Sequence, residues 1–367
     1  MLRYLFAFIM LMHGLIHFMG FSKAFGYGNM TQLTKDIPKP AGILWLLTAF
    51  LFIAATILFL VKKESWPIIS ILAVILSQIL IIIVWKDAKF GAIANLIVLL
   101  VAVPALANIR FNKMVKQEVN SLLSQPVNDS KIIRIEMLDS LPPTVQKYLI
   151  RSGVVGKENI QFARLKQKGE MRIKQDGKWM DFTASQYFDA NDPSFIWQTQ
   201  VQMMPLVTLA GRDKFENGNG HMLIKVLALI NVANSGGDAK INESTMIRFL
   251  AEICLFPTAA LAPYIKWETV DSLAAKATMN YKGMTVSGIY RFHANGDIHN
   301  FTADRWYGSG KDATLEKWFI EYIATKEFNG IRIPCKTEIT WKLKSGDFKW
   351  LKLEITDLEF NKPALYH

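Results

Sequence analysis

Two histidines, His13 and His17, lie four residues apart in an apolar run near the start of the chain. At that spacing their side chains share one face of a helix. An ionisable side chain inside a membrane-spanning helix marks a functional position by default. Three kinds of site are open: a metal or haem site, a polar or quinone-binding contact with Gln78 and Asn95, and hydrogen bonds that join helices. We favour the third, because one helix face cannot bind both sides of a haem and no other apolar run contains a histidine.

Three carboxylates are candidates for acid–base chemistry. Glu252 lies in an otherwise apolar helical stretch, where burial would raise its pKa. Asp213 and Asp304 are weaker candidates of the same kind. The alternative is a structural ion pair between Glu252 and a basic strand residue such as Arg212 or Arg305. We favour the ion pair over a catalytic role.

Large apolar side chains are abundant, with 10 Trp and 23 Phe in the chain. Core packing is their usual role, but a curved sheet with large apolar residues on its concave side can also hold an acyl chain. The residues that we expect to line such a site are Trp197, Phe249, Ile253, Trp267 and Trp341.

A metal site is the other chemistry to consider. His293, Asp297 and His299 surround the turn in "RFHANGDIH", and histidine with carboxylate can hold zinc. Residues that flank a hairpin turn are usually exposed polar positions. We therefore predict no metal site and no cofactor.

The elements that carry these residues fall into two groups. Residues 41–61, 65–85 and 90–109 contain no charged residue, and the run around His13 and His17 is similarly apolar. Each run is near the roughly 20 residues that a helix needs to cross a bilayer. We predict a bundle of four transmembrane helices over residues 1–110, and hence an integral membrane protein, placed in the bacterial inner membrane.

The basic character of the chain follows from this bundle. Residues 1–116 hold 11 Lys and Arg but only three acidic residues, which leaves +3 of the net charge of +11 for the rest. Basic residues that flank spans reflect topology and contact with lipid head groups. We therefore expect membrane lipids and not nucleic acid as partners. Six basic residues flank the spans on the side of the two termini, and five flank them on the other side. The two numbers are nearly equal, so the sequence does not decide which side of the membrane the C-terminal part faces.

A polar linker is expected over residues 111–140, with a turn at Pro126 and Asn128–Asp129. A short helix opens at the prolines of "SLPPTVQKYLIRSG" and ends at Gly153. From about Gln161 onward, apolar and polar residues alternate with period two, which is typical of antiparallel strands with one covered face.

Six turn pairs separate these strands and predict hairpins. They are Asp176–Gly177, Asn217–Gly218, Lys282–Gly283, Asn295–Gly296, Asn329–Gly330 and Ser345–Gly346. Residues 141–367 should therefore form a large curved antiparallel sheet, like a half-barrel, of about ten strands.

An inserted helix over 243–256, capped by Asn242 or Ser244, should cover the concave face of this sheet. The stretch "ATLEKWFIEYI" fits either a second helix or a strand. The two cysteines of the chain, Cys254 and Cys335, are expected to be reduced and buried.

Two resemblances accompany these patterns. The stretches "DPSFIWQTQV", "LAGRDKFENGNGHMLIK", "FLAEICLFPTAAL" and "DRWYG" resemble an uncharacterised bacterial family, a domain of unknown function, over roughly residues 141–361. The curved sheet with its helix is more remotely similar to the half-barrels of lipoprotein carriers, by analogy of fold alone. Arg3 and "GFSKAFG" resemble four-helix membrane proteins of the DoxX type.

The function that these observations favour is a membrane-anchored binding module for a lipid or other apolar ligand, with helix 243–256 as its lid. One alternative is a hydrolase-like enzyme acting on a lipid-like substrate through Glu252 or Asp213. The other is a membrane scaffold or assembly factor. The absence of a recognisable catalytic motif favours binding over catalysis.

Overall fold

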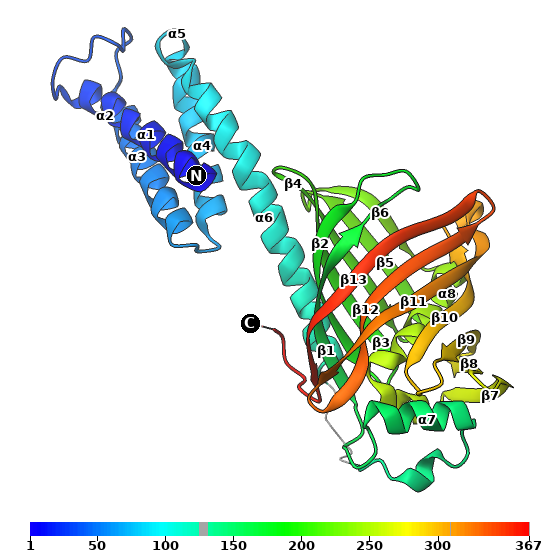
Figure 1. Ribbon diagram of the computed structural model, residues 1–367. Coiled ribbons are helices and arrows are strands. Elements are labelled where there is room, and N and C mark those ends of the chain that lie inside the picture. The colour runs from blue at the N-terminus through cyan, green and yellow to red at the C-terminus, as the bar shows by residue number, and fades with distance from the viewer. Residues whose placement is uncertain (125–130, 309, 367) are drawn as a thin grey trace. The chain divides into compact units, whose positions relative to one another are not determined.

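The computed structural model describes residues 1–124, 131–308 and 310–366, and the chain divides into two units, Met1–Asn112 and Lys113–His367 (Figure 1). Its helices are α1 (Leu2–Ile16), α2 (Phe18–Phe25), α3 (Lys39–Leu60), α4 (Trp66–Ile83), α5 (Trp85–Ala88), α6 (Gly91–Leu122), α7 (Pro143–Ser152) and α8 (Ala239–Glu252), with 3-10 turns η1 (Ile135–Leu138), η2 (Ile253–Leu255), η3 (Pro257–Leu261) and η4 (Gly310–Asp312). Its strands are β1 (Phe162–Met171), β2 (Met180–Asp189), β3 (Ser194–Met204), β4 (Val207–Glu216), β5 (Asn219–Val226), β6 (Ile230–Gly236), β7 (Ile265–Asp271), β8 (Ala274–Tyr281), β9 (Met284–Phe292), β10 (Ile298–Tyr307), β11 (Thr314–Phe328), β12 (Ile331–Leu343) and β13 (Gly346–Phe360).

The first unit is the predicted helical bundle. Four helical segments are long and apolar enough to cross a membrane: Leu2–Phe25, Lys39–Leu60, Trp66–Ile83 and Gly91–Leu122. The first segment consists of α1 and α2, which meet at His17.

Two glycines bring the first segment against α3. A Cβ atom added at Gly20 would lie 2.1 Å from the Trp45 ring, and one added at Gly14 would lie 2.7 Å from Cβ of Phe52. Any larger residue at these positions would force the helices apart, because real Cβ atoms do not approach other atoms so closely. The tight contact places His13 and His17 beside Phe52 and Trp45.

The predicted linker over 111–140 is partly helical. Helix α6 continues without a break to Leu122, so the chain enters the second unit as a helix. The turn predicted at Pro126 and Asn128–Asp129 lies outside the described residues. Helix α7 confirms the helix predicted after the prolines, and it ends at Gly153 with φ of 77°.

The second unit is one 13-stranded sheet, in the order β6-β5-β4-β3-β2-β1-β13-β12-β11-β10-β9-β8-β7. All neighbouring pairs are antiparallel. The sheet is open, because β6 and β7 are edge strands that do not pair with each other. The predicted curved antiparallel sheet is confirmed, with 13 strands in place of about ten.

Several hairpins form where turn pairs were predicted. Asn217–Gly218, Lys282–Gly283 and Asn329–Gly330 all have positive φ at both positions. This is the backbone geometry that type I′ turns require, and Asn and Gly adopt it most easily. The stretch "ATLEKWFIEYI" (313–323), which fitted either a helix or a strand, belongs to strand β11 from Thr314 onward.

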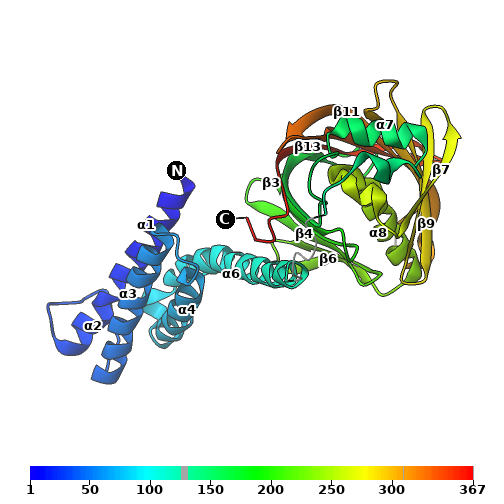
Figure 2. The ribbon, with the colours of Figure 1, turned by 90° about the horizontal axis from the view of Figure 1, so that it is seen from below.

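Helix α8 lies against the concave face of the sheet, as Figure 2 shows in the view from below. It connects the two edge strands in sequence, since it follows β6 and precedes β7. Phe249 of α8 contacts the rings of Phe188 and Phe215, and all three are fully buried. Together with η2 and η3, α8 closes one apolar core with the sheet.

The start of this helix differs from the prediction of 243–256. It begins at Ala239, and Asp238 is its N-cap, with a side chain that accepts a hydrogen bond from N of Ile241. Asn242 and Ser244 lie within the helix, where Asn242 instead accepts a hydrogen bond from N of Gly220. The last predicted residues form the 3-10 turn η2.

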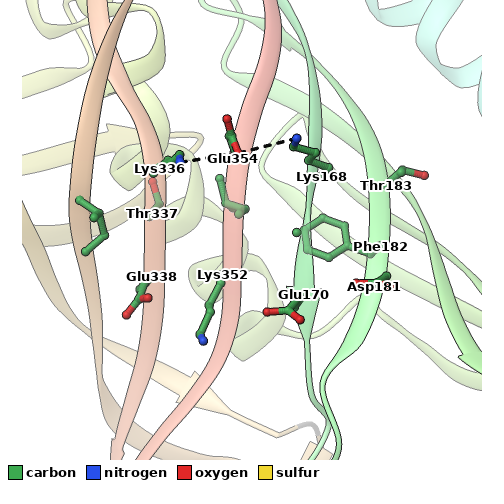
Figure 3. Close-up of a pocket in the computed structure, with 13 residues that line it drawn as sticks. Lys168, Glu170, Asp181, Phe182, Thr183, Lys336, Thr337, Glu338, Lys352 and Glu354 are labelled. Carbon is green, nitrogen blue, oxygen red and sulfur yellow. Dashed lines mark ion pairs between the residues drawn. The ribbon is translucent and has the colours of Figure 1, made fainter.

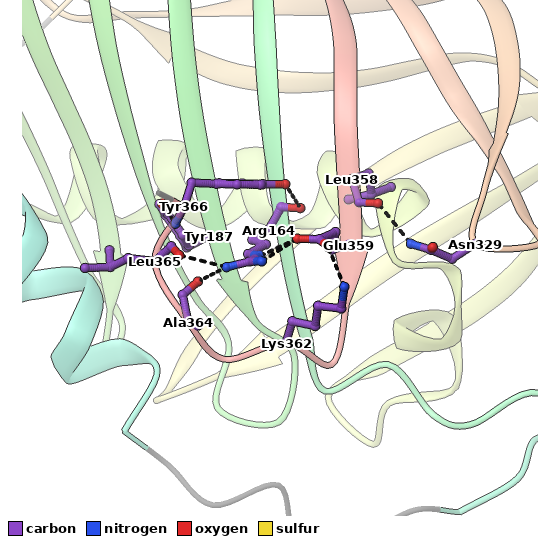
Figure 4. Close-up of polar contacts among 9 residues, drawn as sticks. All are labelled: Arg164, Tyr187, Asn329, Leu358, Glu359, Lys362, Ala364, Leu365 and Tyr366. Atoms are coloured by element: carbon purple, nitrogen blue, oxygen red, sulfur yellow. Dashed lines mark hydrogen bonds and ion pairs between the residues drawn. The ribbon is translucent and has the colours of Figure 1, made fainter.

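The C-terminal residues fold back onto β1 and β2 (Figure 4). Nη1 of Arg164 donates hydrogen bonds to the carbonyl oxygens of Ala364 (2.6 Å) and Leu365 (2.9 Å). The guanidinium also lies over the Tyr366 ring, 4.5 Å from its centre, and ion-pairs with Glu359. These contacts cover part of the outer surface of the sheet.

Candidate functional site

The buried histidines of the bundle form a hydrogen-bonded cluster. Nε2 of His13 lies 2.9 Å from Oδ1 of Asn95 and 3.2 Å from Oγ of Ser77. Nε2 of His17 lies 2.9 Å from the same hydroxyl, and its Nδ1 contacts the carbonyl oxygen of His13 at 2.8 Å. Asn95 in turn donates to Oε1 of Gln78. The cluster therefore links α1, α4 and α6.

This arrangement brings together the four residues that the sequence singled out, His13, His17, Gln78 and Asn95, and adds Ser77. Buried polar groups with partners of this kind hold helices together without a hydrophobic driving force. Their role in joining helices stays a prediction.

A second polar cluster lies inside the sheet domain, on the side of α8 that faces β2 and β4. Nη1 of Arg248 is 2.7 Å from Oδ2 of Asp213, and its Nε is 3.1 Å from Oε1 of Glu252. The other oxygen of Glu252 accepts a hydrogen bond from Gln186 at 2.8 Å. The guanidinium also lies 4.9 Å from the ring centres of Phe195 and Trp197.

Glu252 therefore has an ion-pair partner, as favoured, but the partner is Arg248 and not Arg212 or Arg305. Arg212 points to the other face of the sheet, where it pairs with Glu118 of α6. Asp213 shares Arg248 with Glu252, and Asp304 pairs with Lys317 at the surface. A guanidinium shared by two carboxylates is the arrangement of a structural ion pair.

Arg305 is the other cation inside the sheet domain. Its guanidinium lies 4.4 Å from the ring centre of Trp318 and 5.5 Å from that of Trp341, and Nε donates to the carbonyl oxygen of Ser244 in α8. Burial and the nearby charge of Arg248 lower the pKa of Arg305 to about 10, so it stays protonated at neutral pH. It fastens α8 to β10.

The five residues predicted to bind an apolar ligand belong to one region of the structure. Trp197, Phe249, Ile253 and Trp341 are buried in the core, and Trp267 packs against it. Ile253 and Trp267 border a narrow void that has no room for a water molecule. Phe249 and Leu250 of α8 are fully buried against the sheet, so a ligand can enter there only if the helix moves.

A groove of about 510 Å³ lies on the outer face of the sheet, over β1, β2, β12 and β13 (Figure 3). Its side chains are mostly charged, and Glu354 lies 3.9 Å from both Lys168 and Lys336. These side chains are 40–60% exposed. Exposed pairs of this kind contribute little energy, and the groove is a solvated ladder of alternating charge.

The polar side chains of the hairpin with His293 and His299 have other partners. The two rings are tilted by 36° with 4.5 Å between their centres, and Asp297 pairs with Arg151 and Arg332. Over the described residues, no group of three or more His, Cys, Asp or Glu side chains is placed to hold a metal ion.

Residues 131–353 match the model of a family of unknown function, DUF6544. The chain belongs to this family. No curated protein matches it. The match begins after the helical bundle, so the DUF6544 domain is the sheet domain.

Two solved structures resemble this DUF6544 domain distantly. A LolA superfamily protein from Nitrosomonas europaea is 9% identical, with a TM-score of 0.36, and the match covers 60% of this chain and 95% of that one. A putative outer membrane lipoprotein-sorting protein domain from Vibrio parahaemolyticus is 9% identical, with a TM-score of 0.29, covering 56% and 87%. They agree with the predicted resemblance to lipoprotein carriers, and no functional argument rests on them. The DoxX-type resemblance of the bundle stays a prediction.

Both cysteines of the DUF6544 domain are free and buried, as predicted. Burial raises the pKa of the Cys254 thiol to about 12, and it also raises the pKa of Cys335. The thiolate is the reactive form of cysteine. Neither residue is therefore suited to nucleophilic chemistry at neutral pH.

One buried carboxylate gives the DUF6544 domain a pH-dependent stability. Burial raises the pKa of Asp189, at the end of β2, to about 6, although it accepts hydrogen bonds from N of Asn191 and Asp192. The folded protein then holds a proton on Asp189 that the unfolded chain, with a pKa near 3.8, has lost. Stability from this group is present below pH 4 and is lost as the pH rises to about 6.

We expect the Asp189→Asn variant to gain about 2–3 kcal/mol relative to the parent protein between pH 4 and pH 6. Guanidinium unfolding of the full chain in detergent, followed by tryptophan fluorescence, measures the difference at each pH. The parent protein, measured at the same pH values, is the reference for the change at residue 189. A gap between the two proteins that stays constant over this pH range would contradict the prediction.

Proposed function

We propose that this chain is an integral membrane protein of the bacterial inner membrane whose DUF6544 domain binds a lipid or another apolar ligand on the concave face of its sheet. The four long apolar helices support the membrane location. The ligand-binding part rests on the inner face of the sheet, where apolar side chains are only partly covered.

The observation that carries the proposal is a difference between the two ends of this inner face. Beside α8, the inward-facing rings of Phe188, Phe195 and Phe215 are fully buried. Toward the other end of this face, inward-facing apolar residues of β2, β3, β5 and β12 remain partly exposed: Met180, Met203, Ile224, Val226 and Leu343. An apolar surface that a sheet leaves uncovered on its concave side is a typical binding surface for an apolar chain.

Helix α8 supplies the means to enlarge this surface. The sheet is open between β6 and β7, and α8 is the segment that joins these two edges. Its outward movement would break no strand pairing, because no strand pairs with it. We infer that a bound chain enters at the uncovered end and displaces α8 from the rings below it.

The polar cluster inside the domain argues for binding over hydrolysis. Asp213 and Glu252 share Arg248, so the two carboxylates that an enzyme would need are held in an ion pair. The same contacts hold α8 in place when no ligand is present. The domain is therefore proposed as a binding module.

The test is native mass spectrometry of the full chain purified in detergent, together with titration of a fluorescent fatty acid. The Met203→Glu variant places a charge on the uncovered inner surface and should lower ligand occupancy about tenfold, because burying the charge opposes binding. Gln202→Glu adds the same charge one residue earlier, on an exposed side chain, and should leave occupancy unchanged. A protein that carries no lipid and binds no fatty acid would overturn the proposal.

A further inference from the structure

The strands of the sheet domain end in two different kinds of turn. At one end lie the turns between β1 and β2 (172–179), β3 and β4 (205–206), β5 and β6 (227–229), and β12 and β13 (344–345), which belong to adjacent strands in the sheet. We call these four turns the rim. At the opposite end of β2 to β5 the turns carry Asn191, Asp192, Asn217 and Gly218.

The rim turns contain bulky apolar residues in a backbone conformation that favours Gly and Asn. Leu206 has φ of 67°, Leu227 of 51° and Ala228 of 57°. Positive φ strains a residue with a Cβ atom, and a large side chain there is unusual. At the other end of β4, the same conformation is taken by Asn217 and Gly218. Leucine therefore occupies strained backbone positions at the rim, at residues 206 and 227.

The apolar side chains of the rim point into solvent. Leu206 is 77% exposed, Met204 56% and Ile173 67%. Beside them, Ile230 is 66% exposed and Leu229 42%. Single exposed apolar residues are common, but here five lie at the tips of three neighbouring hairpins on one edge of the sheet.

Basic residues accompany this edge. The turn 172–179 holds Arg172, Lys174 and Lys178 against one acidic residue, Asp176, and the turn 344–345 adds Lys344. Apolar tips with a basic surround match the interface of a bilayer that contains anionic lipids, in which apolar side chains enter the acyl region and lysines remain at the head groups.

We propose that the rim is a membrane-docking edge that inserts its apolar hairpin tips into the surface of a bilayer containing anionic lipids. The chain itself indicates that the partner of the rim is a bilayer. The same polypeptide carries four membrane-spanning segments and continues through α6 into the sheet domain. The chain therefore tethers the sheet domain to a bilayer. The partly exposed inner surface opens toward the same ends of these strands, so docking would bring it to the lipid.

The test compares the two ends of one strand. Leu206→Cys and Asn217→Cys lie just before and just after β4 (Val207–Glu216), share a positive φ, and are both exposed. At about 3.3 Å per residue they are roughly 35 Å apart along the strand. Each full-length variant is labelled with an environment-sensitive fluorophore and reconstituted into vesicles of phosphatidylcholine and phosphatidylglycerol. Parent protein checks that the buried Cys254 and Cys335 stay unlabelled.

Emission from the label at residue 206 should shift to the blue and fall about twofold when the acyl chains are brominated, because an inserted tip lies in the outer acyl region. Emission from the label at residue 217 should not change. Equal quenching at both positions, or at neither, would overturn the proposal. A label at residue 206 that is shielded from water but not quenched by brominated lipid would also overturn it, since a protein would then cover the rim.

This docking is independent of ligand binding. Met203→Glu, which should impair lipid occupancy, should leave quenching at residue 206 unchanged. If the parent protein carries no lipid but the label at residue 206 is quenched, the proposed function is wrong and the docking edge stands. If the parent protein carries lipid but the label is not quenched, the docking edge is wrong and the proposed function stands.

Discussion

A disulfide that fixes α8 to β5 should abolish ligand uptake by the sheet domain. The proposed binding requires α8 to leave the rings beneath it, because Phe249 of the helix is fully buried against Phe188 and Phe215. A Cβ atom at Gly220 would lie 2.9 Å from Cβ of Thr245. Disulfides need about 3.5–4.5 Å between these atoms, so Gly220→Cys with Thr245→Cys can be bridged after a shift of about 1 Å.

The oxidised double variant should bind a fluorescent fatty acid at least about tenfold more weakly than its reduced form, a loss of about 1.4 kcal/mol or more. The reduced form is the matched control, since it has the same two substitutions and a free helix. Oxidised parent protein checks the effect of the oxidant. Equal binding by the oxidised and reduced forms would show that α8 need not move. If the reduced variant fails to fold, hydrogen exchange of α8 with and without ligand tests the same movement.

Much of the sheet could be predicted because its turns have local signatures. Asn217–Gly218 and Asn329–Gly330 adopt the positive φ that their residue types favour, and their strands alternate in burial as the sequence does. Two of the hairpins without such a signature are those at Pro205–Leu206 and Leu227–Ala228. Their turn residues resemble strand interiors, so the strand count was too low. Leu206 and Leu227, which make these turns resemble strand interiors, belong to the rim that we propose to dock on a membrane.

The helix on the concave face shows how a capping signal can be ambiguous. Asn242, Ser244 and Asp238 are all good N-cap residues, and composition alone does not choose among them. Tertiary contacts decide, because Asn242 accepts a hydrogen bond from β5 and so lies inside the helix. Asp238 is left to cap the free backbone N–H groups.

The polar cluster in the helical bundle can be predicted from the sequence more fully than the cluster in the sheet domain. His13, His17, Gln78 and Asn95 are conspicuous because their surroundings are otherwise apolar. The partner of Glu252 can be found from spacing on the helix, although the basic residues of the strands compete as candidates. Arg248 precedes Glu252 by four residues, which is the spacing of an intrahelical ion pair. Asp213, from a strand far away in the sequence, completes the cluster, and no local pattern could have placed it there.

The largest loss of stability should follow removal of Arg248. Arg248→Leu leaves Asp213 and Glu252 without their cation at a site where their side chains are only 24% and 18% exposed. Removing one partner of a buried ion pair costs about 3–5 kcal/mol, and the residual solvent contact here places the expected loss near the lower end, at about 3 kcal/mol. Denaturant unfolding of the full chain, followed by tryptophan fluorescence, measures it.

The decisive control removes the charges along with their partner. Combining Arg248→Leu with Asp213→Asn and Glu252→Gln removes both carboxylates that had lost Arg248, and the amide oxygen introduced at position 252 can still accept the hydrogen bond from Gln186. Because an intact buried ion pair contributes little beyond an apolar replacement, this triple variant should recover most of the lost stability. A triple variant as unstable as Arg248→Leu would mean that the stacking of the guanidinium on Phe195 and Trp197, and not the charge, stabilises the domain.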